Sequence, residues 1–324
     1  MRELKTTEAV GKTLCQDITQ IIKGEKKGPV FRKGHVIREE DIPVLLSVGK
    51  DHIYIWEEGE DTLHENDAAA MLYEMGRSEN MHPSEVKEGK IEFIADCDGM
   101  LKIQSEKLFA LNSFGQMMMA TKKNHSFIKK GEAFAGTRII PLSIEREKME
   151  EVKKIAPEGG ILQLLPFEKK KVGLISTGNE VFYKRIQDSF TPVVREKLFP
   201  YPVEIIGHVT CPDDVEQEKE AILGFLEQGA DLVICMGGMS VDPDDRTPLA
   251  IRLSTEEVVS YGAPVLPGSM FMLAYAKGKV PVLGLPGSIM FCPTTVFDLV
   301  LPRIMAGDMV KKEEIDALGE GGLL

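Results

Sequence analysis

The chain has 324 residues, of which 43% are hydrophobic and 28% are charged, a composition typical of soluble globular proteins with two or three domains. Its formal net charge of −12 and its lack of a basic run argue against nucleic acid or an anionic membrane as a partner. No apolar segment approaches the roughly 20 residues that span a bilayer. The start of the chain lacks the apolar core of a signal peptide, so we expect a cytoplasmic protein without a membrane partner.

The cysteines and histidines indicate neither a disulfide framework nor a zinc site. The five cysteines are far apart and odd in number, and they form no Cys-x-x-Cys pair. We therefore expect free thiols in a reducing compartment. The six histidines form no close pair of the kind that binds zinc.

The first half of the chain is interpreted as two small units joined to a larger domain by a linker. Residues 1–57 predict a small β-rich unit, with a short helix that ends at Gly49 and an alternating strand from His52 to Trp56. Residues 58–150 predict an α+β unit that begins with an amphipathic helix at His64. Residues 151–167, which are charged and contain proline and glycine, are interpreted as a linker.

The second half alternates strands with helices, which predicts a mostly parallel sheet over residues 168–310. The helix over Val215–Gln228 has Asp213 as its expected N-cap, and a further helix is expected over Phe291–Met305. The polar tail, residues 311–324, is expected to fray. The expected strands are Lys171–Ser176, Val203–Val209, Ala230–Met236 and Val280–Leu285.

Three of these strands run into glycine-containing turns. The apolar run Leu232–Met236 fits a strand buried on both faces, and it stops at Gly237-Gly238. Thr177-Gly-Asn-Glu180 and Pro286-Gly-Ser288 follow two of the other strands. The carboxyl ends of parallel strands meet at one edge of a sheet, where open α/β folds bind ligands. The three turns can therefore build one pocket.

The turn after Met236 has two interpretations, as has the acidic loop that follows it. The N–H groups of Gly237 and Gly238, helped by the Ser240 hydroxyl, could bind a phosphate, or the turn could be only a tight strand exit. Asp242, Asp244 and Asp245 crowd one loop, which should raise the pKa of at least one acid unless a cation compensates. Mg²⁺ suits such oxygen ligands, and the alternative is a solvated acidic turn.

The order and spacing of several short motifs resemble one known domain. The motifs are Thr177-Gly-Asn-Glu180, Asp188-Ser189, Asp213-Asp214, Gly237-Gly-Met-Ser240, Asp245 and Leu285-Pro-Gly287. They resemble the molybdopterin-binding domain that is shared by MoeA, MogA, gephyrin and the competence-damage proteins. The resemblance covers about residues 168–306 and is weaker before them. It implies an α/β fold, namely a three-layer αβα domain with a mostly parallel sheet, which holds a pterin dithiolene phosphate. Small β-rich and α+β units precede this domain.

The resemblance also implies roles for individual residues. Asp245-Arg-Thr-Pro248 is similar to the Asp-x-Thr-Pro segment of the MogA branch, so Asp245 is the expected catalytic residue. Asn179 stands where the family usually has an aspartate, and an amide cannot serve as a charged metal ligand. Asp188 could bind a cation or could equally cap the next helix. The expected Mg²⁺ ligands are Glu180, Asp188 and Asp245. The expected molybdopterin-binding residues are Thr177, Gly178, Asn179, Glu180, Ser189, Gly237, Gly238, Ser240, Pro286, Gly287 and Ser288.

Three functions remain open on this basis. The first is an enzyme of molybdenum cofactor biosynthesis that inserts molybdenum with Mg²⁺ or adenylylates the pterin. The second is a non-catalytic molybdopterin carrier for a molybdoenzyme client, favoured by Asn179 and by the loss of the basic residues that flank the family's Pro-Gly at the position of Pro267-Gly268-Ser269. The third is a nucleotide hydrolase of the competence-damage type. Molybdopterin or its nucleotide form is the expected ligand in the first two, and a homodimer is expected.

Overall fold

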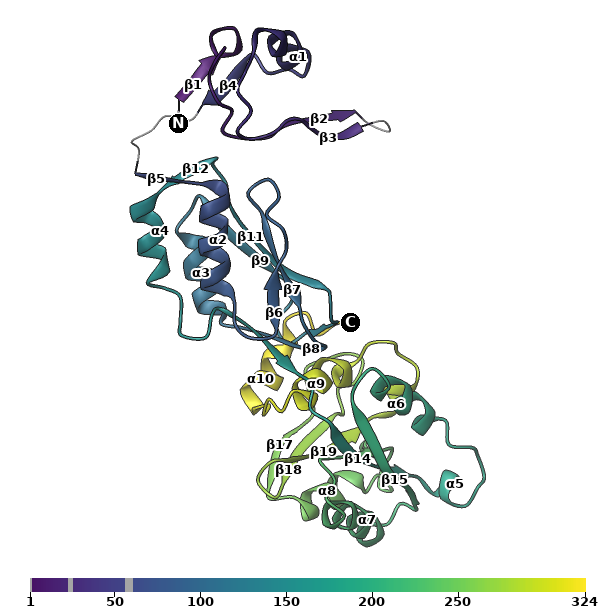
Figure 1. Ribbon diagram of the computed structural model, residues 1–324. Coiled ribbons are helices and arrows are strands. Elements are labelled where there is room, and N and C mark those ends of the chain that lie inside the picture. The colour runs from purple at the N-terminus through teal and green to yellow at the C-terminus, as the bar shows by residue number, and fades with distance from the viewer. Residues whose placement is uncertain (1, 23–25, 56–60) are drawn as a thin grey trace. The chain divides into compact units, whose positions relative to one another are not determined.

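A computed structural model describes residues 2–22, 26–55 and 61–324 of the chain (Figure 1). The chain divides into two compact units. Unit 1 comprises residues 1–97, 102–123 and 129–164, and unit 2 comprises residues 98–101, 124–128 and 165–324. The predicted boundary between residues 57 and 58, and the predicted end of a strand at Trp56, lie outside the described residues.

Unit 1 begins with two antiparallel strand pairs and a short helix. β1 (Arg2–Lys5) pairs with β4 (His52–Ile55), and β2 (Ile18–Ile22) pairs with β3 (Lys26–Phe31). Ile53 and Ile55 are buried while the two residues beside them in β4 are exposed, the alternation that the sequence predicts. The helix is α1 (Ile42–Ser47), and the 3₁₀ turns are η1 (Thr6–Glu8) and η2 (Glu39–Asp41).

The remainder of unit 1 is a four-stranded antiparallel sheet with helices. The sheet has the order β6-β7-β11-β9, and α2 packs against β11. His64 caps α2 because its imidazole accepts the N–H of Asn66, so the predicted helix begins where the sequence indicated. The elements are β5 (Thr62–His64), α2 (Glu65–Gly76), β6 (Met81–Pro83), β7 (Ile91–Ala95), α3 (Ser105–Ser113), β9 (Met117–Thr121), β11 (Ala133–Ile139), β12 (Ser143–Glu145) and α4 (Arg146–Lys153).

Three short strands form a further sheet of order β10-β8-β13. They are β8 (Gly99–Ile103), β10 (Phe127–Ile128) and β13 (Leu162–Pro166). The segment 151–167, interpreted from its composition as a linker, therefore contains the end of α4 and all of β13.

Unit 2 is built on a six-stranded sheet of order β15-β14-β16-β19-β18-β17. The first four strands in this order are parallel, whereas β18 and β17 each run antiparallel to the preceding neighbour. The prediction of a mostly parallel sheet is confirmed, although the sequence analysis did not identify β17 and β18. The strands are β14 (Lys170–Thr177), β15 (Val203–Cys211), β16 (Leu232–Met236), β17 (Glu257–Tyr261), β18 (Met272–Ala276) and β19 (Val280–Leu285).

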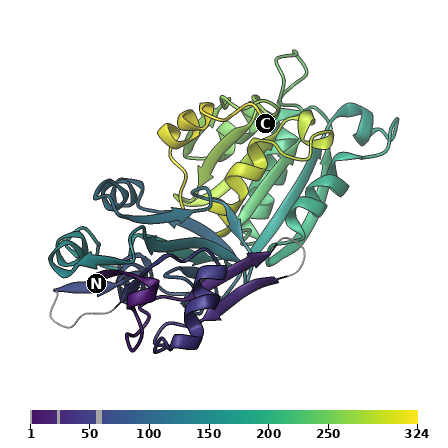
Figure 2. The same ribbon diagram turned by 90° about the horizontal axis from the view of Figure 1, so that it is seen from above.

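Helices cover both faces of this sheet and complete three layers (Figure 1). α6 (Phe190–Leu198) and α9 (Val296–Met305) pack on one face, and α7 (Val215–Glu227) and α8 (Thr247–Ser254) pack on the other. α9, in yellow, lies in front of the green strands when the molecule is seen from above (Figure 2). Leu232, Ile234 and Met236 join the core on the first face, while Val233 and Cys235 join the second. β16 is thus buried on both faces, as its apolar run predicts.

The end of the chain differs from its prediction. Residues 311–324 contain α10 (Lys312–Asp316) and η4 (Ala317–Gly319), and Ile315 is fully buried in the core. The expectation of a frayed tail is therefore wrong, because Ile315 and Leu318 pack on the core and the backbone of Leu266 is hydrogen-bonded to Gly322 and Leu324. Within the ranges given above, no helix is long and apolar enough to cross a membrane.

Candidate functional site

The three glycine-containing turns begin side by side at one edge of the sheet. β14 and β16 are adjacent and pair Ser176 with Met236, while β16 and β19 pair Met236 with Leu285. The first glycines after these strand ends are Gly178, Gly237 and Gly287. The parallel arrangement therefore places them at the carboxyl edge of the sheet, where the sequence analysis expects a pocket.

The Gly237-Gly238 turn is shaped by the packing of the protein itself. Both glycines have left-handed backbones, with φ of 101° and 60°. A Cβ at Gly237 would lie 2.7 Å from the Thr177 carbonyl oxygen, and a Cβ at Gly238 would lie 2.5 Å from Thr247 Oγ1. Glycine is therefore required at both positions whether or not a ligand binds.

The same turn leaves several main-chain donors available. The Gly237 N–H donates to the Leu285 carbonyl at 3.4 Å. The N–H groups of Gly238, Met239 and Ser240 have no hydrogen-bond partner among the residues that the structure describes. Successive main-chain N–H groups in a turn can form an anion-binding concavity when they point the same way. These contacts are compatible with the anion-binding interpretation of the turn.

A tyrosine on the edge strand β17 forms hydrogen bonds with the residues after this turn. The Tyr261 hydroxyl, on β17, donates to the Met239 carbonyl at 3.1 Å and lies 3.4 Å from that of Ser240. Burial, followed by the charge of Asp245, raises the pKa of this phenol. Asp245 itself accepts the Asp242 N–H at 3.3 Å, so its carboxylate forms a hydrogen bond within its own loop. The expected catalytic residue therefore lies beside the turn.

Asn179 and Asp213 connect the turns after β14 and β15. The Asn179 N–H donates to Asp213 Oδ2 at 2.9 Å. Burial raises the pKa of Asp213, and the charges of Glu180, Asp245 and Asp244 raise it further. The acids of the loop after β16 therefore raise the pKa of Asp213, which lies in the loop after β15.

The N-cap of α7 is a correction to the sequence analysis. Asp214, not Asp213, caps this helix by accepting the Gln217 N–H at 2.9 Å. The two aspartates are adjacent in sequence, and Asp213 instead accepts the Asn179 N–H. Asp213 therefore lies at the edge of the sheet where the turns meet.

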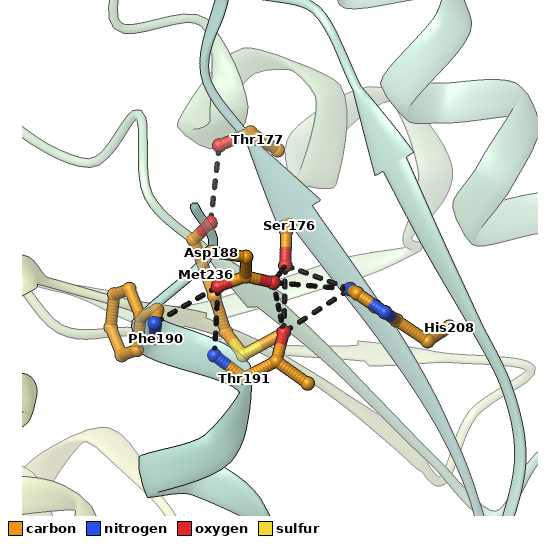
Figure 3. Close-up of polar contacts among 7 residues, drawn as sticks. All are labelled: Ser176, Thr177, Asp188, Phe190, Thr191, His208 and Met236. Atoms are coloured by element: carbon orange, nitrogen blue, oxygen red, sulfur yellow. Dashed lines mark hydrogen bonds and ion pairs between the residues drawn. The ribbon is translucent and has the colours of Figure 1, made fainter. Parts of the chain in front are cut away.

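Asp188 lies in a polar network at the start of α6 (Figure 3). It accepts the N–H groups of Phe190 and Thr191 at 2.9 and 3.0 Å and the hydroxyls of Ser176 and Thr191 at 2.8 and 2.5 Å. Burial raises the pKa of Asp188, but these hydrogen bonds outweigh it and hold the pKa below its ordinary value. The contacts are those of a helix cap, one of the two interpretations that the sequence leaves open.

His208 on β15 completes this network. Its Nε2 lies 2.9 Å from Ser176 Oγ, 3.1 Å from Thr191 Oγ1 and 3.5 Å from Asp188 Oδ2. Burial lowers the pKa of His208, while Asp188 raises it in part. Ser176 is buried and shares one carboxylate oxygen with Thr191, so the group braces the loop between β14 and α6.

The third turn is joined to the same loop. Ser189 Oγ lies 3.6 Å from the sulfur of Met290. Gly287 opens the 3₁₀ turn η3 (Gly287–Met290), and the carbonyl of Ser288 accepts the N–H of Cys292 at 3.2 Å. Thr177, by contrast, points inward, and its hydroxyl lies 3.0 Å from that of Thr247.

Sequence reasoning missed two residues that shape the site. Thr247 belongs to the Asp245-Arg-Thr-Pro248 motif, where only the aspartate received a role. Tyr261 lies on a strand that the analysis did not identify, so no sequence signal could have brought it to the turn. Among the described residues no three His, Cys, Asp or Glu side chains gather to hold a metal ion, and Mg²⁺ coordination by Glu180, Asp188 and Asp245 stays a prediction.

A separate hollow of about 740 Å³ belongs to unit 1. It is lined mainly by apolar side chains of α2 and of residues 153–158, including Met71, Tyr73 and Met75. None of the predicted site residues lines it.

Residues 173–306 match a family described as "Probable molybdopterin binding domain". This part of the chain belongs to the molybdopterin-binding domain family. The resemblance predicted from the glycine turns and from Asp245 is thereby confirmed. Residues 3–57 match a second family, described only as a domain of unknown function.

Curated relatives match parts of the chain. The molybdopterin molybdenumtransferase of Synechococcus elongatus is 27% identical over 180 residues, which cover 53% of this chain and 42% of that protein. A CinA-like protein of Mycolicibacterium vanbaalenii is 40% identical over 78 residues, which cover 24% and 18%. The solved structure of the molybdopterin biosynthesis enzyme MoaB from Thermus thermophilus has a TM-score of 0.38 at 23% identity, and covers 44% of this chain and 98% of that one. The chain therefore spans less than half the length of these two curated relatives.

Proposed function

We propose that unit 2 binds molybdopterin and serves the biosynthesis or insertion of the molybdenum cofactor. The observation that supports this most is the set of unpaired N–H groups at Gly238, Met239 and Ser240, in a domain of the molybdopterin-binding family. Main-chain N–H groups at a strand end suit the terminal phosphate of the pterin. The turns that carry Thr177 to Glu180, and Pro286 to Ser288, flank this position and would hold the rest of the ligand.

The acidic surroundings of the turn support a role for Mg²⁺. Asp213, Glu180 and Asp245 lie close enough for their charges to interact. A phosphate beside these carboxylates is unfavourable unless a cation compensates, and Mg²⁺ prefers carboxylate and phosphate oxygens. Glu180 and Asp245 would hold the ion, which would neutralise charge on the phosphate. Asp188 is less available, because four hydrogen bonds already occupy its oxygens.

Asp245 would have different roles in an enzyme and in a carrier protein. In a transferase that inserts molybdenum or adenylylates the pterin, Asp245 would hold Mg²⁺ at the reacting group. In a carrier it would only shape the loop, as its bond to the Asp242 N–H does. The CinA-like relative favours, as a second candidate, a nucleotide hydrolase on the same edge of the sheet. We place the protein in the cytoplasm as a homodimer that passes its pterin to a molybdoenzyme client.

Molybdopterin binding can be tested with a glycine that the fold does not require. A Cβ at Gly287 would meet only Met290 Cε, at 3.7 Å, so Gly287→Val keeps the turn but fills the space above it. Gly238→Val cannot serve, because its side chain would collide with Thr247. We expect Gly287→Val to abolish binding of molybdopterin released anaerobically from a molybdoenzyme. Gly224→Val, on α7 where a Cβ meets nothing within 4 Å, is the matched control. Full binding by Gly287→Val would place the pocket elsewhere.

Asp245→Asn then separates the enzyme from the carrier. In a transferase, turnover should fall by orders of magnitude while binding is nearly kept. In a carrier, affinity should change modestly and there is no turnover to lose. Sedimentation at micromolar concentration tests the homodimer, and a clean monomer would contradict it.

A further inference from the structure

Glu218 is a buried carboxyl group without a hydrogen-bond partner of normal geometry. It lies on α7 and is 1% exposed. Neither of its carboxyl oxygens has a partner within the described part of the chain. A buried ionised carboxylate that is not paired is costly, so this group is either neutral or held for a purpose.

The groups that act on the charge of Glu218 come from several of the elements packed around it. Burial raises its pKa to about 7, the Thr247 hydroxyl on α8 acts in the opposite direction, and the charges of Asp213 and Asp214 raise it further. Cys211 on β15 and Cys235 on β16 complete the surroundings, since Glu218 raises the pKa of both thiols in addition to burial. None of these neighbours carries a positive charge that would stabilise an ionised Glu218.

Two threonine hydroxyls connect Glu218 to the Gly237-Gly238 turn. Thr247 Oγ1 lies 3.0 Å from Thr177 Oγ1, and the Thr177 hydroxyl donates to the Met236 carbonyl at 3.4 Å. Thr247 Oγ1 is also the atom that a Cβ at Gly238 would strike at 2.5 Å. The side chain that faces Glu218 is therefore packed directly under the turn.

We propose that Glu218 is a positioning residue for the anion-binding turn, and that it acts by staying protonated in the buried space beside Thr247. With the proton in place, the Thr247 hydroxyl donates to Thr177, and Thr177 donates to Met236. Loss of the proton leaves a carboxylate that can only accept, so the Thr247 hydroxyl turns to donate to Glu218 and no longer donates to Thr177. The same step places a negative charge beneath a turn that binds an anion.

Two measurable consequences follow for pH. The turn should change its conformation or hydrogen bonding when Glu218 loses its proton, and the affinity for an anionic ligand should fall as the pH rises. The second consequence rests on the proposed function, whereas the first does not. Glu218→Gln keeps a donor of similar shape but cannot ionise. Glu220→Gln, an exposed acid on the same helix, is the matched control.

The first experiment follows the amide NMR signals of Gly237 and Gly238 from about pH 5 to about pH 9 in the full chain. We expect both signals to titrate with a common midpoint near 7 in the wild type and in Glu220→Gln, and not in Glu218→Gln. An unchanged titration in Glu218→Gln overturns the proposal, as do wild-type signals that do not move.

The second experiment measures molybdopterin binding over the same pH range. The wild-type affinity should fall roughly tenfold, the effect of one lost or reversed hydrogen bond. Glu218→Gln and Glu218→Leu, neither of which can ionise, should both keep the low-pH affinity throughout. A wild-type pH dependence that persists in Glu218→Gln overturns the proposal. If no variant binds molybdopterin while the glycine signals still titrate through Glu218, the proposed function fails and the positioning role stands.

Discussion

The Asn179 N–H donates to Asp213 Oδ2 at 2.9 Å, and Asn179 Oδ1 lies 3.5 Å from the Asp213 nitrogen. This reciprocal contact joins the turn after β14 to the turn after β15. It also gives a physical reason for an amide at position 179. Asp213 already has a raised pKa from burial and from the charges of Glu180, Asp245 and Asp244. A carboxylate at position 179 would add one more negative charge to this group.

Asn179→Asp should therefore destabilise the protein at neutral pH, by about 1–2 kcal/mol, through like-charge repulsion at Asp213. Urea unfolding at pH 7 and at pH 5 measures the effect, which should shrink at the lower pH as an acid becomes protonated. Added Mg²⁺ should restore part of the loss if a cation binds among these carboxylates. Asn179→Ala is the control, since it removes the amide without adding charge.

Asp188→Ala should destabilise unit 2 by about 1–3 kcal/mol, because it removes the cap of α6 and leaves buried hydroxyls at Ser176 and Thr191 without their acceptor. The pKa of Asp188 is depressed in the folded protein, so its contribution is present above the unfolded value near 3.8 and is lost as the pH falls through the folded value. Denaturant midpoints at neutral pH provide the measurement. Wild-type stability in this variant would show that the network is not needed for α6.

His208→Gln should make the protein less sensitive to acid. Burial depresses the pKa of His208, so the unfolded chain takes up a proton at this position first when the pH falls below its ordinary value of 6.5. The wild type should therefore lose stability from about pH 6.5 downward, until the folded histidine is protonated as well. Thermal melts of both proteins between about pH 7.5 and pH 5 should diverge in slope. Parallel curves would mean that other groups dominate acid unfolding.

Glu218→Gln should be more stable than the wild type at alkaline pH. The folded pKa of Glu218, about 7, lies above the unfolded value of 4.5, so folding is penalised increasingly from pH 4.5 to about 7 and by a constant amount above that. The gain at pH 8 is on the order of 1–3 kcal/mol relative to pH 4.5. Chemical denaturation at the two pH values measures it, and Glu220→Gln should show no such difference.

The sequence predicted the parts of unit 2 that depend on local pattern. The apolar run Leu232–Met236 predicts a buried strand because a strand buried on both faces has no polar positions. The paired glycines after it predict where the strand ends. The capping exchange between Asp213 and Asp214 was not predictable, since both have the right chemistry and only the distant Asn179 decides between them. β18 was missed because an antiparallel strand within a parallel sheet carries no separate signal in its residues.

Glu218 could have been found from helix spacing alone. It lies four residues before Ile222 and seven before Phe225, which places it on the buried face of α7. An acid at such a position is unusual, because charged residues are rarely buried without a partner. Its proximity to the Gly237-Gly238 turn could not be predicted in this way, since Thr247 belongs to another helix.

Some glycines at this edge of the sheet are required by the packing of the protein and others are not, and this difference determines which of them evolution could replace. Gly237 and Gly238 are held by Thr177 and Thr247, so a descendant that had given up its ligand would still keep both. Gly287 has no such neighbour within close contact and would be free to drift once nothing needed the space above it. The residue at position 287, rather than the paired glycines, would therefore record whether a lineage still uses the pocket.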